Sequence, residues 1–196
     1  MKEAYVNLLE DRRRQLLDEL KPILAGKSEF VCEIGCGHGH FLTAYATAHP
    51  DRACLGVDLV SERVERARKK RDRARLANLH FLRVEARLFF AVLPAGVRFS
   101  SIYILFPDPW PKLRHHKHRI IQPEFLEVLA ARATPKCRLY FRTDFGPYFS
   151  EAQSTVRDHP RWQLVEESWP FEYETVFQAR AESYASLVAA LRPAPH

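Results

Sequence analysis

The sequence predicts an α/β fold built on a mostly parallel, doubly wound sheet with helices on both faces. Three observations predict it. Short apolar, strand-like segments alternate with helical segments through residues 29–158, a glycine-rich turn follows the first of these strands, and acidic residues stand where several strands end. Alternation at this spacing favours parallel strands joined by helical crossovers. We therefore expect a single domain over residues 1–196.

The elements follow in order along the chain. The predicted strands are apolar segments rich in β-branched or aromatic residues, at 29–34, 53–59, 79–84, 101–106 and 138–142. The predicted helices have apolar residues at helical spacing or a flanking stop signal, at 3–21, 41–48, from 61 onward, briefly between the third and fourth strands, at 122–133 and at 147–158. Pro22 should end the first helix and Ser61 should cap the third. Residues 183–191 are compatible with a strand or a helix.

Composition limits the class of protein. With 46% hydrophobic residues among 196, the chain can bury one sizeable core. The longest uncharged run, residues 34–50, is broken by glycines and histidines and is shorter than the roughly 20 apolar residues of a membrane span. The amino-terminal residues are charged and lack the apolar core of a signal peptide. We expect a cytoplasmic protein without a membrane segment; no feature specifies an oligomeric state.

Basic residues are concentrated in two stretches. The chain has 30 Lys and Arg against 24 Asp and Glu, for a net charge of +6. The excess lies in residues 61–76 and 112–119, whereas residues 144–182 are acidic. This distribution favours a polyanionic partner such as a nucleic acid. For residues 61–76, an ordinary solvated helix face explains the charges equally well.

No metal site is expected. Cys32, Cys36, Cys54 and Cys137 form neither a CxxC pair nor a zinc spacing. Three of them stand beside strand-like apolar residues and should be buried thiols. The histidines at 115, 116 and 118 lie among cations, which oppose a metal charge.

The glycine turn EIGCGHGH, residues 33–40, indicates a ligand site. A dinucleotide fingerprint would need a third glycine at position 40, which is His40. Glu33 would repel a pyrophosphate but suits a cationic amine. Asp58 ends the second strand and could accept both ribose hydroxyls, and Glu85 could accept an exocyclic amine or water near the base. These features together describe S-adenosylmethionine; alternatively, the acids only cap helices.

A second candidate site follows the fourth strand, in Pro107-Asp108-Pro109-Trp110-Pro111-Lys112. The prolines stiffen the turn and put Asp108 and Trp110 at the carboxyl end of the sheet, where ligands bind in such folds. An acid beside an aromatic ring suits a planar base, and the cations of KLRHHKHR suit phosphates. Alternatively, Trp110 packs in the core or at a hinge.

The run FPDPWPKLRHHKHRIIQPEFL resembles the hallmark stretch of the bacterial tRNA (guanine-N7)-methyltransferases. EIGCGHGHFL, GVDLV, RTDFGPYFSEA and TVFQAR resemble further motifs of that family in the same order, so the resemblance spans roughly residues 27–182. It implies a Rossmann-like class I fold that uses S-adenosylmethionine. The implied reaction methylates N7 of a guanine in tRNA, at position 46 of the variable loop, giving 7-methylguanosine.

The resemblance also assigns residues. It implies that six residues bind S-adenosylmethionine: Glu33, Gly35, Gly37, Asp58, Glu85 and Asp108. It makes Asp108 the catalytic residue. It assigns the substrate to Lys112, Asp144, Thr175, Val176, Phe177 and Gln178, and RNA contacts to Arg114, His115, His116, Lys117, His118 and Arg119.

Two features depart from the family pattern. Gln178 stands where the family has a glutamate, and the chain starts almost at its first helix, without the basic extension common in the family. A methyltransferase of another RNA or of a small molecule therefore remains open. An RNA-binding protein that has lost catalysis is less favoured, because every acid of the donor site is present.

Overall fold

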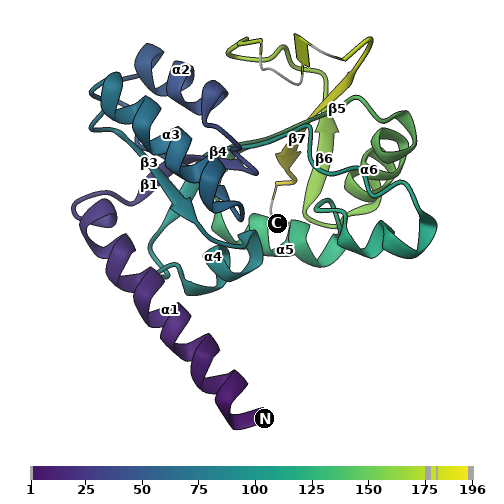
Figure 1. Ribbon diagram of the computed structural model, residues 1–196. Coiled ribbons are helices and arrows are strands. Elements are labelled where there is room, and N and C mark those ends of the chain that lie inside the picture. The colour runs from purple at the N-terminus through teal and green to yellow at the C-terminus, as the bar shows by residue number, and fades with distance from the viewer. Residues whose placement is uncertain (1, 175–177, 180, 194–196) are drawn as a thin grey trace.

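A seven-stranded sheet organises the computed structural model, which describes residues 2–174, 178–179 and 181–193 (Figure 1). Its strands are β1 (Glu29–Ile34), β2 (Cys54–Asp58), β3 (Leu79–Arg83), β4 (Arg98–Leu105), β5 (Ala133–Thr143), β6 (Trp162–Val165) and β7 (Ala185–Leu191). The helices are α1 (Lys2–Leu24), α2 (His40–Ala48), α3 (Ser61–Arg73), α4 (Ala86–Val92), η1 (Leu113–His118, a 3-10 helix), α5 (Pro123–Arg132) and α6 (Gly146–Asp158).

The strand order is β3-β2-β1-β4-β5-β7-β6. Strands β1 to β5 are parallel, and β7 runs antiparallel to both β5 and β6. The predicted doubly wound α/β fold is therefore confirmed. The direction in which the chain winds reverses between β1 and β4, and in such sheets ligands bind outside the carboxyl ends of the strands at that reversal.

Each face of the sheet has its own core. Ile102 and Ile104 of β4 pack with α1, α4, α5 and α6 on one face, and Tyr103, between them, packs with α2 and α3 on the other. Alternation of this kind follows from the two-residue repeat of a strand. On the second face, two residues of an irregular segment complete the core: Trp169 packs on Tyr103, and Phe171 packs on α2.

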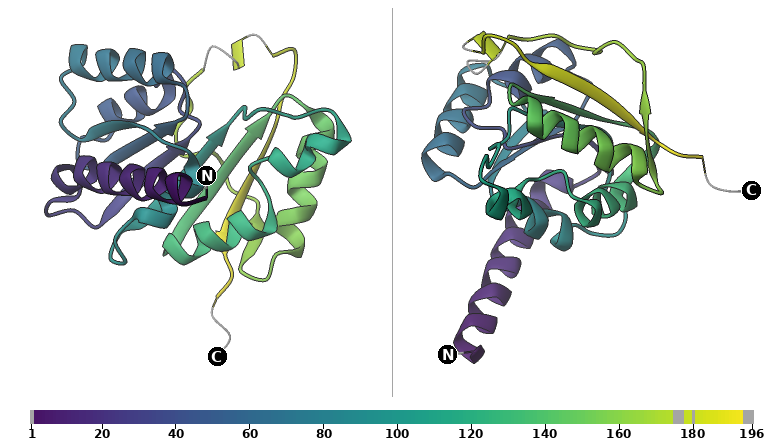
Figure 2. Two further views of the ribbon diagram at one scale, coloured as in Figure 1. Left: turned by 60° about the horizontal axis from the view of Figure 1, so that its bottom comes forward. Right: turned by 90° about the vertical axis from the view of Figure 1, so that its right-hand side faces the viewer.

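Helix α1 does not end at Pro22, as the sequence predicted, but continues to Leu24. A proline this close to the end of a helix costs only one backbone hydrogen bond. Leu20 and Ile23 are buried on one side of the helix, and their packing against the sheet offsets that loss. The amino-terminal turns extend beyond the rest of the molecule (Figure 1 and the right-hand view of Figure 2).

Three further expectations are corrected or decided. Ser61 does not cap α3: Val60 is the cap residue, and its N–H donates to Asp58 Oδ1 at 2.8 Å. Residues 113–118 form the short helix η1 rather than a loop. Residues 185–191 are a strand, β7. Within the described part of the chain, no helix is both long and apolar enough to cross a membrane.

Candidate active site

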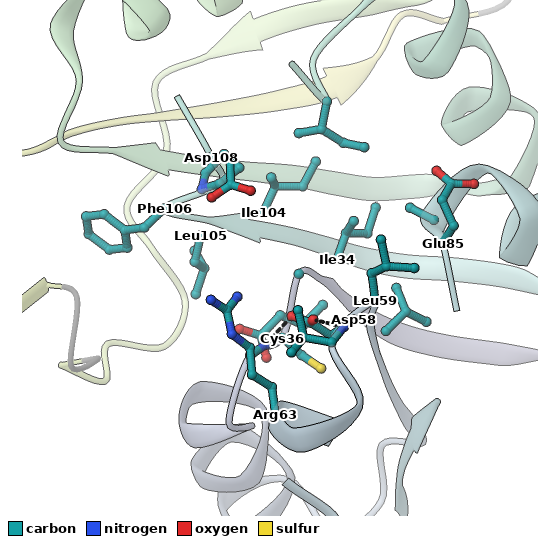
Figure 3. A pocket seen from close by; sticks show the side chains of 18 of the residues that line it. Ile34, Cys36, Asp58, Leu59, Arg63, Glu85, Ile104, Leu105, Phe106 and Asp108 are labelled. Atoms are coloured by element: carbon teal, nitrogen blue, oxygen red, sulfur yellow. Dashed lines mark hydrogen bonds between the residues drawn. The ribbon is translucent and has the colours of Figure 1, made fainter. Parts of the chain in front are cut away.

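A cavity of about 600 Å³ lies at the carboxyl ends of β1, β2 and β4 and beside the turn after β3. Its volume is typical of a small-molecule site. All six residues that the sequence assigned to S-adenosylmethionine line it: Glu33, Gly35, Gly37, Asp58, Glu85 and Asp108. Figure 3 shows Asp58, Glu85 and Asp108 on different sides of one hollow, with Arg63 of α3 beside Asp58. The fold thus gathers residues from four strand ends.

The glycine turn shapes the floor of this cavity. Gly37 has a φ of 51°, which a residue with a Cβ rarely adopts, and no atom lies within 4 Å of where that Cβ would be. The backbone there is open to a ligand. Gly39 serves packing instead, because a Cβ would come 2.6 Å from the Phe81 ring and 2.8 Å from Ala67.

Asp58 is the best-fixed acid of the site. It is 7% exposed, and its Oδ2 accepts the N–H of Gly37 at 2.9 Å while its Oδ1 accepts that of Val60 at 2.8 Å. A carboxylate has about four lone-pair sites, so both oxygens keep capacity for a further donor. The two backbone bonds hold the carboxylate rigidly toward the cavity, as a pair of ribose hydroxyls would require.

Glu33 is buried, and its Oε2 has no hydrogen-bond partner among the described residues. Burial raises its pKa well above the usual range; the backbone N–H of Leu42 opposes this, Asp58 raises the pKa further and Lys70 lowers it. A buried carboxylate without a partner is costly. Glu33 lines the cavity, so a cationic amine bound there would favour its ionised form. The donor set therefore fits S-adenosylmethionine.

Glu85 has a structural role as well. It is the cap residue of α4, and its Oε2 accepts the N–H of Leu88 at 2.8 Å. The alternative reading, in which strand-end acids cap helices, thus holds for this acid. Glu85 also lines the cavity and is exposed, so the capping bond does not prevent it from accepting a hydrogen bond from the base of a ligand.

The turn that carries Asp108 is strained. Phe106 and Trp110 have φ values of 49° and 44°, unusual for residues other than glycine, and they flank Asp108 on either side. Such conformations cost about 1–3 kcal/mol each and persist where their surroundings enforce them. One restraint is the bond from the Phe106 N–H to the Arg142 carbonyl, at 2.8 Å. Strain held this way fixes the position of an exposed carboxylate at the cavity rim.

Arg119 supplies a second restraint, and its predicted role as an RNA contact is wrong. Its side chain is 1% exposed, forms an ion pair with Glu151 and lies 4.8 Å from the ring centre of Tyr148. It donates to the carbonyls of Pro109 at 2.9 Å and Trp110 at 3.4 Å. Because a guanidinium has five donors, it can hold the turn and the ion pair at once. Buried in this way, it cannot reach an RNA phosphate.

The predicted RNA contacts on η1 itself have three different environments. Arg114 and Lys117 are exposed and available to a polyanion. His115 and His118 pack on Trp110, with ring centres 5.8 and 5.1 Å away, and His118 also lines the cavity. His116 is directed to Glu151 instead, with 3.2 Å from Nδ1 to Oε2. Trp110 therefore packs on imidazoles at the mouth of the cavity rather than in the core.

Of the residues assigned to the substrate, those that the structure describes do not line this cavity. Lys112 and Asp144 are exposed and do not line it. Thr175, Val176 and Phe177 lie outside the described residues. Gln178 accepts a hydrogen bond from Arg142 at 3.1 Å and donates to the Tyr184 hydroxyl at 3.0 Å.

Sequence reasoning missed Arg142, Glu151 and Arg63. Arg142 and Glu151 stand in the motif RTDFGPYFSEA, but the motif does not reveal their roles, since both act through partners more than 30 residues away.

Cysteine and metal chemistry find no support in the described residues. All four cysteines are buried and free, and burial raises the pKa of Cys54 and of Cys137 to about 12. Within the part of the chain that the structure describes, no group of three or more His, Cys, Asp or Glu residues could hold a metal ion.

Sequence comparison finds the same family resemblance. The family model Methyltransf_4, described as "Putative methyltransferase", matches residues 27–185. A tRNA (guanine-N(7)-)-methyltransferase of Syntrophotalea carbinolica is 34% identical over 64% of this chain and 54% of its own length. One from Nitrosomonas europaea is 30% identical over 82% of this chain and 73% of its own. The chain spans little more than half the length of several such relatives, at 54% to 58%.

Comparison of structures supports the fold. The 16S rRNA (adenine(1408)-N(1))-methyltransferase of Catenulisporales acidiphilia, a W203A mutant solved with its cosubstrate, is 20% identical. It superposes with a TM-score of 0.58 over 91% of this chain and 93% of its own. The fold is that of the class I S-adenosylmethionine-dependent methyltransferases, as predicted.

Proposed function

The chain belongs to the bacterial tRNA (guanine-N7)-methyltransferase family, and from this premise we propose that it transfers the methyl group of S-adenosylmethionine to N7 of a guanine in tRNA. One observation carries the proposal. The glycine turn, Glu33, Asp58, Glu85 and Asp108 line a single cavity at the point where the winding of the sheet reverses. We also propose that residues 1–196 act as a single domain in the cytoplasm.

The donor site divides its task among its acids. When bound, S-adenosylmethionine supplies a methyl group on a positively charged sulfur. Asp58, held by two backbone N–H groups, would accept the ribose hydroxyls. The carboxylate of Glu33 would attract the amine, and Glu85 would lie near the base. Each carboxylate would then accept hydrogen bonds from the ligand. A site lined by carboxylates favours a cationic ligand over the negatively charged phosphates of a nucleotide.

The acceptor side needs alignment more than proton transfer. Guanine N7 carries no proton and lies on the exposed major-groove edge of the base. No general base is required. Asp108, fixed at the cavity rim by the strained turn, would stabilise the positive charge that develops on the methylated base. Trp110 would restrain the base beside it.

The tRNA would reach the site over η1. Arg114 and Lys117 are exposed cations of η1, whose histidines pack on Trp110, and they suit phosphates of the backbone. Lys112, Asp144 and residues 175–178 would contact the nucleotide that carries the target guanine, by family resemblance the one at position 46 of the variable loop.

The proposal is tested by methylating unmodified, transcribed tRNA with the purified chain and S-adenosylmethionine. We expect 7-methylguanosine by mass spectrometry of the digested nucleosides, at one guanine of the variable loop by cleavage mapping. Wild-type protein that binds the donor and tRNA but forms no 7-methylguanosine would contradict it.

A second candidate, methylation of another RNA, is favoured by one observation. Gln178 replaces the family glutamate, and its amide oxygen accepts a hydrogen bond from Arg142. The same assay with ribosomal RNA and with free guanosine separates the two. Activity on ribosomal RNA that exceeds activity on tRNA would favour the second candidate.

A further inference from the structure

Arg142, at the carboxyl end of β5, makes a set of contacts that neither the sequence motifs nor the proposed chemistry explains. Its side chain is 6% exposed and lies between two aromatic rings, 4.0 Å from the ring centre of Trp169 and 4.7 Å from that of Tyr184. It donates to both oxygens of Glu172, at 3.1 and 3.2 Å. Further bonds reach Gln178 at 3.1 Å and Ser186 at 2.8 Å.

All these partners except Ser186 belong to the connection between β6 and β7, residues 166–184, which lies at the top of the view in Figure 1. Within its described residues, this connection contains no strand, and only residues 178–179 are helical. Its shape therefore depends on side chains. The guanidinium of Arg142 contacts two aromatic rings of this connection and bonds both oxygens of one of its carboxylates. These contacts restrain the connection strongly, because a guanidinium is rigid and loses little conformational freedom per bond formed.

The same residue also reaches the turn of the active site. The Arg142 carbonyl accepts the N–H of Phe106, the strained residue two positions before Asp108. The Phe106 ring in turn packs on Tyr184, with ring centres 5.9 Å apart. Phe106 lines the cavity, and Figure 3 shows its ring directed away from Asp108. Arg142 thus contacts the Asp108 turn through its backbone and the β6–β7 connection through its side chain.

We propose that Arg142 is a positioning residue that fixes the β6–β7 connection, and Gln178 with it, relative to the Asp108 turn for binding of the RNA substrate. This rests on the proposed function for the identity of that substrate. The amide at position 178 accords with it: Glu172 already neutralises Arg142, so a second carboxylate here would add an uncompensated charge beside a cation that is already paired.

Activity tests the proposal through a double-mutant cycle. Arg142→Ala, Gln178→Ala and the double variant are compared with wild type for kcat and KM toward tRNA and for donor affinity by calorimetry. We expect Arg142→Ala to lower kcat/KM for tRNA at least tenfold, with donor affinity within twofold of wild type. In the Gln178→Ala background, Arg142→Ala should lower kcat/KM for tRNA no more than two- to threefold, because the two residues act as one unit. Arg142→Lys, which keeps the charge but not the fork of donors, should restore part of the loss.

Arg138→Ala is a matched control. Arg138 also lies on β5 and makes a two-point ion pair with Glu167 of the same connection, at 2.8 Å for each bond, but its other hydrogen bonds go to the backbone carbonyls of Lys136 and Cys137. Its side chain and that of Glu167 are 29% and 40% exposed, so the pair is worth little. We expect kcat/KM within twofold of wild type.

A second readout needs neither tRNA nor the donor. Hydrogen exchange of peptides that cover residues 166–174 and 181–187 should accelerate at least tenfold in Arg142→Ala and not in Arg138→Ala, while peptides of β1 to β3 keep their protection. If wild-type protein fails to methylate tRNA, the proposed function falls, and this exchange experiment still decides the role of Arg142.

Three results would overturn the proposal. Exchange of the β6–β7 connection could be unchanged in Arg142→Ala. The fold losses in kcat/KM from Arg142→Ala and Gln178→Ala could multiply in the double variant, which means that the two residues act independently. Donor affinity could fall in parallel with kcat/KM, which means general damage to the sheet.

Discussion

Arg119 and Glu151 form an ion pair whose cation is buried beneath the turn that carries Asp108. The guanidinium joins this turn to α6, since it bonds the carbonyls of Pro109 and Trp110 on one side and the carboxylate on the other. The strain at Phe106 and Trp110 is thus restrained by an interaction outside the cavity.

Glu151→Ala should therefore weaken both stability and catalysis. Loss of one partner of a fully buried pair costs about 3–5 kcal/mol. Because Glu151 is 34% exposed and water can enter, we expect about 2 kcal/mol, or a Tm lower by roughly 4–8 °C for a chain of this size. kcat should fall while donor affinity stays within twofold.

Glu127→Ala, which breaks an exposed pair with Arg161, is the control and should leave Tm and kcat nearly unchanged. Equal melting temperatures for the two variants would contradict a supporting role.

Glu33→Gln should stabilise the donor-free protein and weaken donor binding. Burial raises the pKa of Glu33 above its usual 4.5, so the folded state binds this proton more tightly than the unfolded state. The free energy of unfolding then falls as pH rises above about 4.5 through the folded pKa. The glutamine variant does not lose stability in this way. Its free energy of unfolding should therefore exceed that of wild type by an amount that grows with pH, to on the order of 1 kcal/mol at neutral pH. Denaturant titrations from pH 4.5 to 8 measure it.

Donor affinity should show the opposite dependence. A cationic amine prefers the ionised carboxylate, so wild-type affinity should rise with pH through the same range and the variant should lack this rise. Calorimetry in two buffers of different ionisation enthalpy should detect a proton released on binding to wild type only. A variant that binds the donor as tightly as wild type would remove Glu33 from the site.

Asp58→Asn should weaken the donor without unfolding the turn. The amide keeps one oxygen as acceptor but loses the charge, and hydrogen bonds to a charged group are worth about 1.5–3 kcal/mol. We expect a Kd for S-adenosylmethionine at least tenfold higher by calorimetry. Asp58→Ala would also release the N–H groups of Gly37 and Val60, so its larger effect mixes binding with loop order. Unchanged affinity in a folded Asn variant would reject Asp58 as the ribose acceptor.

Local patterns were sufficient for the fold and for the floor of the cavity. The glycine turn and the acids at strand ends are fixed by strand position, so their convergence could be predicted once parallel strands were expected. The continuation of α1 past Pro22 could not, because it depends on Leu20 and Ile23 packing against distant strands. The burial of Arg119 has the same cause. In the sequence, Arg119 is one of several cations in a row, with nothing to separate it from the others. It differs from them only in the fold, where Glu151 of α6 forms an ion pair with it.

Substitution of η1 cations should change the salt dependence of tRNA binding. Arg114→Gln with Lys117→Gln removes two exposed charges beside Trp110. For each phosphate that is no longer bound, the slope of log K against log salt should fall in magnitude by about 0.7–0.9. Lys27→Gln with Lys136→Gln removes the same charge near the amino ends of β1 and β5, away from the cavity, and should leave the slope unchanged. Donor affinity should be equal in all variants. Equal slopes for the two double variants would make η1 an ordinary charged surface.

Asp108→Asn distinguishes electrostatic stabilisation from base catalysis. The amide preserves the shape of the exposed side chain between Pro107 and Pro109 but removes the charge that favours a cationic product. We expect kcat to fall by one to two orders of magnitude or more, which corresponds to about 1.4–2.7 kcal/mol of barrier. Because N7 has no proton to lose, the wild-type rate should stay flat from neutral to alkaline pH, with no second group needed as proton acceptor. Single-turnover kinetics with saturating donor measure the step directly. A folded, donor-bound Asn variant that methylates at the wild-type rate would leave Asp108 a structural residue, and the chemistry would then have to be sought near Asp144.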